Sequence, residues 1–224
     1  QPNGLARALR TTDTGIIGMV SDLIATTPYA MQMIHGAQSA AAESGHVLML
    51  VNTGRDLRAE GDGTQALLSY QVHGIVYAAM AHRVVDSNTI ATTVPVVLAN
   101  ERDDTGRFDT VVSNDHAASM TAVQTLIAAG HTKIAHLTYK TDLLGPTLRL
   151  RGYLDAMREA GLPVDDRSVI EASDFTAPAS REAAIDSLRD ASDRPTAIFC
   201  VSDQLAMGLY QAAARLGLSI PTEL

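Results

Sequence analysis

Polar residues follow several short apolar stretches of this sequence, at the points where those stretches end. They carry hydroxyl, amide and carboxylate groups, which donate and accept hydrogen bonds. The positions are Ser21, Asp22, Asn100, Glu101, Asn114, Asp115, Ser202 and Asp203, together with the polar segment 139–149. Ligands of open α/β sheets bind outside the carboxyl ends of the strands. With the apolar stretches as strands, these groups line a cleft suited to a polyol or a sugar.

Motifs of catalysis and of cofactor binding are absent from the sequence. Ser21, Asp22 and Leu23 follow the first apolar stretch, where a dinucleotide-binding protein has a glycine-rich motif. Neither a GxxxxGK(S/T) phosphate loop nor a GxSxG nucleophile motif occurs. The seven histidines are scattered and form no HExxH pair, and His131 stands at a turn, where we expect a structural role. We therefore expect a binding protein rather than an enzyme, with no cofactor and no metal ion.

Charge and cysteine content narrow the function classes further. The formal net charge of −8 makes this chain a poor nucleic-acid binder by itself, because phosphate binding needs clustered Lys and Arg. No apolar stretch reaches about 18 residues, so we expect no membrane span. Cys200 is the only cysteine, which excludes an internal disulfide and agrees with a reducing cytoplasm. Its apolar neighbours favour a buried small hydrophobic side chain over a reactive thiol.

Short apolar stretches alternate with longer stretches of helical periodicity along the chain. The expected strands are residues 15–20, 46–51, 72–77, 94–99, 110–112, 133–138, 168–172 and 196–201. The expected helices are residues 29–44, 60–70, 115–129, 147–160, 178–189 and 203–216. Continuous apolar strands joined by helices indicate parallel sheets with helices on both faces. About eight strands fit two doubly wound sheets better than one, and we expect the chain to cross between the sheets within residues 138–146.

Seven short sequence segments, called phrases below, occur in the order typical of one protein family. They are residues 5–11, 72–76, 95–100, 130–135, 149–153, 195–203 and 206–208. In these phrases the chain resembles the LacI/GalR transcriptional regulators. The resemblance implies an α/β fold of the periplasmic-binding-protein-like type I, with two doubly wound parallel-sheet subdomains and a ligand cleft between them. It implies a hinge-helix remnant at residues 1–11, an N-terminal subdomain at 12–138 and an incomplete C-terminal subdomain at 139–224.

The resemblance also implies a function, which is to sense a small-molecule effector. The effector is expected to be a sugar or sugar derivative that controls DNA binding by a missing N-terminal helix-turn-helix. A cytoplasmic homodimer without membrane contact is expected. Gln1 reads as a fragment boundary, and the family continues beyond Leu224 with segments that return to the first subdomain. Two alternatives remain open. The first is a periplasmic sugar-binding protein of a transporter, which a signal peptide upstream of Gln1 would favour. The second, with weaker support, is a doubly wound enzyme.

Three residues are the strongest candidate effector ligands by this resemblance. Arg149 matches an arginine that grips polar groups of the effector, and its guanidinium offers a fixed fork of donors. Asn100 lies at the end of a strand, where the family has Asp or Asn. Phe175 matches an aromatic residue that stacks on the effector ring, although one of only three Phe residues serves equally well as core filler.

The other candidate ligands each have a structural alternative. Asp115 starts a helix, where capping explains it as well as binding does. Asp203 is expected to be the N-cap of the last helix, and Ser202 replaces a common Asn of the family. Tyr29 offers an apolar ring with a polar tip. Asp22 ends the first strand, but the spacing that follows it is longer than the family pattern.

Overall fold

The computed structural model describes residues 14–23, 28–90 and 92–224, apart from the side chains of 28–30. The expected hinge-helix remnant at residues 1–11 lies outside the described residues. The chain divides into two compact units, Gln1–Ser113 and Asn114–Leu224. This division comes earlier than the boundary we expected after residue 138. The reason is that the helix that follows Ser113 packs within the second unit, a contact between distant residues that the local sequence pattern does not reveal.

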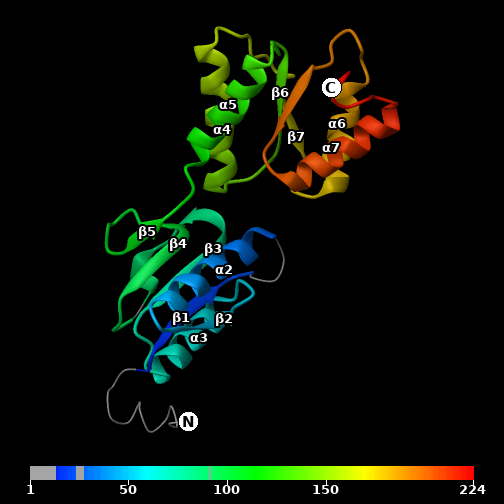
Figure 1. Cartoon of the computed structure of the whole chain (residues 1–224). Helices are drawn as coiled ribbons and strands as arrows, with labels where there is room; N and C mark the ends of the chain where they lie inside the picture. The colour runs from blue at the N-terminus through cyan, green and yellow to red at the C-terminus, as the bar shows by residue number, and fades with distance from the viewer. Residues whose placement is uncertain (1–13, 24–27, 91) are drawn as a thin grey trace. The chain divides into compact units, whose positions relative to one another are not determined.

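The first unit is built on one parallel sheet of five strands in the order β2-β1-β3-β4-β5 (Figure 1). The strands are β1 Ile16–Ser21, β2 Val47–Asn52, β3 Ile75–Val84, β4 Val96–Arg102 and β5 Asp109–Val111. The helices are α2 Pro28–Glu43 and α3 Leu57–Ser69, with a short 3-10 helix at Ser87–Thr89. The order of strands, with β1 between β2 and β3, is that of a doubly wound sheet.

Helices α2 and α3 cover opposite faces of the first sheet. Successive side chains of a strand point to opposite faces. Ile17 faces the α2 side, where it lines a small cavity with Ala37 and Ala40. Gly18, the next residue of β1, lies against Leu67 of α3. Leu67 belongs to the buried core of this unit, which gathers apolar side chains of β1, β3, β4 and α3.

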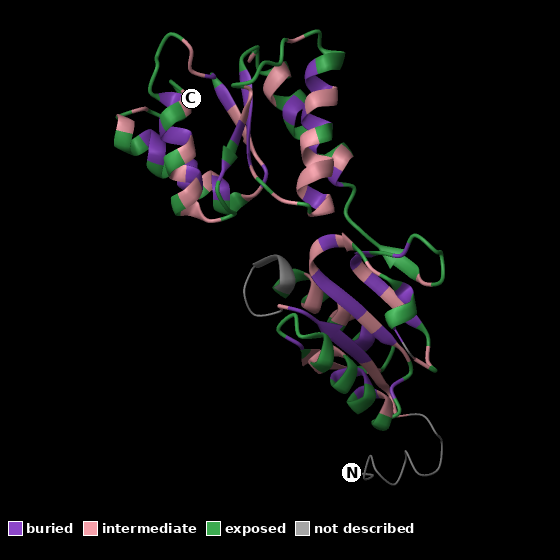
Figure 2. Ribbon diagram, turned by 180° about the vertical axis from the view of Figure 1, so that it is seen from behind, coloured by how far each residue is buried: buried purple, intermediate pink, exposed green. Residues whose placement is uncertain are grey.

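The second unit is a three-layer sandwich around the parallel sheet β7-β6-β8. Its strands are β6 Ile134–Tyr139, β7 Val169–Ala172 and β8 Ala197–Cys200. Its helices are α4 Asp115–Ala128, α5 Leu144–Glu159, α6 Ala177–Leu188 and α7 Asp203–Leu216. Helices α4 and α5 lie on one face of the sheet and α6 and α7 on the other (Figure 1). The central strand β6 is buried at every residue except its last, as expected for a sheet covered on both faces, and Figure 2 shows buried positions along this sheet.

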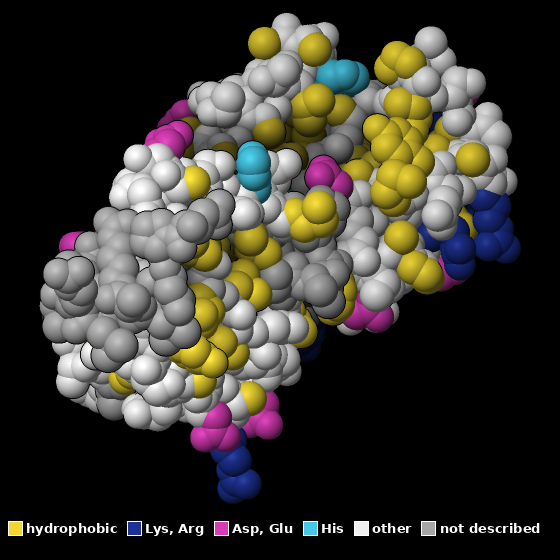
Figure 3. All heavy atoms as spheres, turned by 60° about the horizontal axis from the view of Figure 1, so that its bottom comes forward, with side chains coloured by type: hydrophobic (Ala, Val, Ile, Leu, Met, Phe, Trp, Pro, Cys, Tyr) yellow, Lys and Arg dark blue, Asp and Glu magenta, His cyan; other side chains and the backbone are white. Residues whose placement is uncertain are grey.

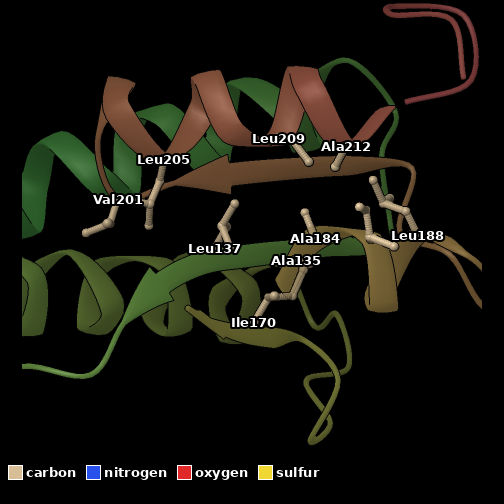
Figure 4. Packing of buried hydrophobic residues seen from close by; sticks show 10 residues of the cluster. Ala135, Leu137, Ile170, Ala184, Leu188, Val201, Leu205, Leu209 and Ala212 are labelled. Atoms are coloured by element: carbon tan, nitrogen blue, oxygen red, sulfur yellow. The ribbon is translucent and has the colours of Figure 1, made fainter. Parts of the chain in front are cut away.

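Alternation along the central strand β6 divides the core of the second unit in two. Ile134 packs with Tyr153 and other side chains on the α4/α5 side. Ala135 and Leu137 pack on the other side with residues of α6 and α7 such as Leu205, as Figure 4 shows. Two separate apolar layers therefore hold the sheet, and each layer fixes one helix pair against it.

Both helix pairs of the second unit cross at a glycine. A Cβ atom on Gly152 of α5 would lie 2.8 Å from the Ser119 Cβ of α4 and closer still to the His116 carbonyl oxygen. A Cβ atom on Gly208 of α7 would collide with the Ser180 hydroxyl of α6 and would lie 2.9 Å from the Arg181 backbone nitrogen. Because only glycine fits at either crossing, the helices of each pair approach closely.

The elements of the first unit differ from the expected ones mainly at strand ends. Strand β3 was expected to end at residue 77 but continues to Val84, and β4 continues past residue 99 to Arg102. An irregularity in the register after Ala78 is followed by pairing of Arg83 with Glu101. Their side chains form an ion pair of 2.5 Å, which holds the extension in place. Asn100 and Glu101 therefore lie within a strand rather than after it.

Candidate functional site

Asp22 and Asn100 lie on one row across the carboxyl end of the first sheet. Ser21 pairs with Ala78, and Ala78 pairs with Ala99 of β4. The next residues along the chain are Asp22, Ala79 and Asn100. Because β3 lies between β1 and β4, the two candidate ligands lie on either side of it.

Both side chains of this row also brace the backbone. A carboxylate oxygen of Asp22 accepts a hydrogen bond of 2.9 Å from the Met80 backbone N–H, and the other lies 3.5 Å from the Arg55 Nε. The amide Nδ2 of Asn100 donates to the Ala79 carbonyl at 3.0 Å. Asn100 has a backbone φ of 58°, a left-handed conformation that Asn tolerates better than most residues. Only 5% of Asp22 and 6% of Asn100 is exposed.

Arg149 joins three elements at the carboxyl end of the second sheet. Its Nε donates to the Asp115 carboxylate at 2.9 Å, and one terminal nitrogen donates to the Val201 carbonyl at 2.5 Å. Asp115 begins α4 and is almost fully buried, whereas 37% of the Arg149 side chain remains exposed. Ser119 of α4 donates to the Arg149 carbonyl at 2.6 Å. A guanidinium held on one edge and exposed on the other is oriented to donate to a ligand.

Helix caps at this edge fall one residue earlier than the sequence analysis expected. Asn114 caps α4 by accepting from the Ala117 N–H at 3.1 Å, so capping does not explain the burial of Asp115. Ser202, not Asp203, caps α7, because the Ser202 backbone is extended and its hydroxyl accepts from the Leu205 N–H at 3.4 Å. Our assignment of the cap to Asp203 was therefore wrong. Asp203 is instead the first residue of α7 and is exposed.

Phe175 lies beside Tyr139 at the same edge of the second sheet. Tyr139 ends β6, and Phe175 stands between β7 and α6. Their ring centroids are 6.2 Å apart in an edge-to-face arrangement. Because 56% of Phe175 is exposed, it is not core filler. The edge that holds Arg149 thus also presents an aromatic surface of the kind that stacks on a sugar ring.

Buried beneath this edge is His136, which the sequence analysis did not single out. Its ring is fully buried on β6, stacked near Tyr153 and Phe199. The Nδ1–H donates to the Phe199 carbonyl at 3.0 Å. Burial lowers the pKa of His136 to about 4, with a further contribution from the positive charge of Arg149. An uncharged ring therefore lies under the arginine, and its place on the central strand of a sheet covered on both faces could have predicted its burial.

The remaining candidates are less informative. Tyr29 lies in the first turn of α2, and its side chain is outside the described residues. Cys200 is partly rather than fully buried, yet burial raises the pKa of its thiol to about 12. Within the described part of the chain, no cluster of His, Cys, Asp and Glu could hold a metal ion, and no helix is long and apolar enough to cross a membrane.

A cavity of about 710 Å³ in the second unit lies at the opposite end of the sheet. Residues that begin the strands line it, including Ile134 and Val169. The two basic residues of its wall, Lys133 and Arg167, both contact Asp193. No candidate ligand faces it, so we place the site at the carboxyl ends of the strands despite the size of this cavity.

The two parallel α/β units, with polar residues at the carboxyl ends of their strands, define a periplasmic-binding-protein-like core. The family described as periplasmic binding proteins and sugar binding domain of LacI family matches residues 14–224. The chain therefore belongs to this family. It is the effector-binding core of a LacI/GalR-type regulator.

Individual relatives and structures agree with this assignment. Over the full chain the sequence is 30% identical to catabolite control protein A of Priestia megaterium and 30% identical to the ribose operon repressor of Haemophilus influenzae. It covers 67% and 66% of these two proteins, about two thirds of their length. A LacI-family structure from Rhizobium etli matches 94% of the chain and 76% of its own length, with a TM-score of 0.83 and 27% identity. A LacI-family regulatory protein from Chloroflexus aggregans matches the same shares with a TM-score of 0.80 and 25% identity.

Proposed function

We propose that this core binds a small polyol or sugar at the carboxyl ends of its strands and thereby controls DNA binding by a helix-turn-helix domain. That domain would precede residue 1 in the full-length protein, which we propose to be a cytoplasmic homodimer. The observation that carries the proposal is the geometry of Arg149. Its guanidinium is fixed by Asp115 and the Val201 carbonyl, and part of it is exposed at the edge where ligands of this fold bind.

The residues around Arg149 suit a ring with hydroxyl groups. A guanidinium can donate to two neighbouring hydroxyl oxygens, because its donors form a rigid fork. The exposed ring of Phe175 can cover the apolar face of a sugar. In the first unit, the Asp22 carboxylate and the Asn100 amide are further groups that can hydrogen-bond to hydroxyls, although both residues are largely buried. Relatives named as ribose operon repressors include those of Haemophilus influenzae and Escherichia coli.

Control of DNA binding follows as linkage between two sites. An effector that favours one arrangement of the two units changes DNA affinity only through its different affinity for the arrangements. The core itself is expected to bind DNA poorly, because its net charge of −8 repels the phosphate backbone. Among the described side chains visible in Figure 3, Lys and Arg stand in a few places and form no broad basic surface on that face.

A ligand screen tests the binding half of this proposal. We expect a thermal shift of the full-length protein with one member of a panel of sugars, sugar phosphates and nucleobases. An effector at about 100 times its dissociation constant stabilises the folded state by about 2.7 kcal/mol. A panel without any shift from a sugar or polyol would overturn the sugar assignment.

Substitution of Arg149 tests the site itself. Arg149→Ala should weaken binding of the effector found in the screen by about 1.5–3 kcal/mol, the range for hydrogen bonds to charged groups. Arg151→Ala is the matched control, because Arg151 is an exposed residue of the same helix. Isothermal titration that gives equal affinities for the two variants would remove Arg149 from the site.

The coding sequence upstream of Gln1 tests the regulatory half. A helix-turn-helix domain there is the expected finding. A secretory signal peptide in its place would instead identify a periplasmic receptor.

A further inference from the structure

The charge of Arg149 is already balanced within the second unit. Its Nε lies 2.9 Å from a carboxylate oxygen of Asp115, and the Asp115 side chain is 3% exposed. A buried carboxylate this close compensates the guanidinium whatever else binds there. Arg149 therefore offers directed hydrogen-bond donors to a ligand but little net positive charge.

The two helices that begin beside Arg149 carry acidic residues in their first turns. Asp115 is the first residue of α4, and Asp203 is the first residue of α7. The amino end of a helix attracts anions through its dipole and its unbonded N–H groups. A carboxylate in the first turn compensates that dipole, so neither helix is set up to receive a phosphate.

The loops at this edge also carry more carboxylates than cations. Asp142 and Asp174 are exposed in the loops that follow β6 and β7, whereas Lys140 is the one further cation of these loops in the described chain. Two cations at the carboxyl end of the first sheet also face carboxylates. Arg55 lies 3.5 Å from Asp22, and Arg83 lies 2.5 Å from Glu101.

We propose that the effector is uncharged: a free sugar or polyol, and not its phosphate ester or its acid. This inference rests on the proposed function. An anionic ligand would lose its hydration at an edge where carboxylates outnumber cations, and, apart from Lys140, the cations named above already face carboxylates. A neutral hydroxyl avoids that loss, because it only exchanges hydrogen bonds with water for hydrogen bonds with Arg149.

Matched pairs of ligands test the proposal on the full-length protein. The pairs are ribose with ribose 5-phosphate, glucose with glucose 6-phosphate, and glucose with gluconate. Isothermal titration should give at least about tenfold tighter binding for the neutral member of any pair that binds. Equal or tighter binding of the charged member would overturn the inference and leave the proposed function standing. Failure of every sugar, neutral or charged, would overturn the proposed sugar site and the inference together.

A charge-removing substitution tests the cause. Asp115→Asn keeps an oxygen that can accept from the Arg149 Nε but removes the balancing charge. The affinity for the phosphorylated member relative to the neutral member should rise by about tenfold. Asp166→Asn is the control, because it removes one charge at an exposed position before β7, at the opposite end of the sheet.

Asp203 provides a second substitution for the same measurement of the affinity ratio, should the Asp115→Asn protein fail to fold. Asp203→Asn removes an exposed carboxylate at the same edge and should move the affinity ratio in the same direction. An unchanged ratio in a folded Asp115→Asn or Asp203→Asn protein, measured against Asp166→Asn, would contradict the charge argument.

Discussion

Replacing Gly152 by alanine tests whether the α4–α5 crossing positions the candidate site. The added Cβ would lie 2.8 Å from the Ser119 Cβ, where ordinary contact begins at 3.4 Å, and it would also press on the His116 carbonyl. Neither neighbour is the flexible end of a side chain, so the helices must separate. Contacts this short put the overpacking cost at the upper end of its usual range, about 3 kcal/mol, and the better helix propensity of Ala returns about 1 kcal/mol.

The net expectation is a loss of about 2 kcal/mol in the free energy of unfolding, measured by urea denaturation. Separation of the helices should also disturb the 2.6 Å bond between Ser119 and the Arg149 carbonyl, and with it the position of Arg149. Gly61→Ala in α3 is the control, because nothing lies within 4 Å of a Cβ there, and it should be neutral or slightly stabilising. A Gly152→Ala protein as stable as Gly61→Ala would refute the packing argument.

Three further predictions concern single residues. Burial lowers the pKa of His136 to about 4, against 6.5 for an unperturbed His, so the unfolded chain takes up the proton first as the pH falls. Lowering the pH from 6.5 to 4 should therefore cost up to about 3 kcal/mol of stability. Calorimetry should show a smaller loss for His136→Phe. The raised pKa of Cys200 should make its labelling by a thiol reagent at pH 8 at least about tenfold slower than that of free cysteine, and equal rates would contradict its burial. Asn100→Ala should cost about 2 kcal/mol through a lost hydrogen bond and left-handed strain. Asn100→Gly should cost less, because only the hydrogen bond is lost.

Local signals in the sequence were sufficient to predict most of the second unit. The strands expected at 133–138 and 196–201 correspond to β6 and β8, and α7 spans the expected residues 203–216. The expected helices 29–44 and 115–129 stop directly before Gly45 and Gly130, and both glycines have the positive φ values, of 74° and 95°, that are common just after a helix. These features depend on residues near in the chain, which a sequence pattern records directly.

Features that depend on contacts between distant residues were missed. The division into units follows from the packing of α4 on α5, which joins residues 30 or more positions apart, as in the Ser119–Arg149 bond. The extension of β3 depends on Arg83 meeting Glu101. Whether Ser202 or Asp203 caps α7 depends on backbone angles, since both residue types are good caps. Arg149 was chosen by resemblance, and its three contacts could not be predicted from the sequence alone.

The glycines at the two helix crossings affect how this family can be searched and redesigned. Gly152 and Gly208 fall within two of the phrases by which the sequence resembles LacI/GalR regulators, and both are explained by a lack of space between helices. At these two glycine positions a search pattern therefore detects the scaffold, and neither position carries information about the effector. Substitutions meant to test ligand preference belong in the loops after the strands, for example at the exposed Phe175, while both crossings are left untouched.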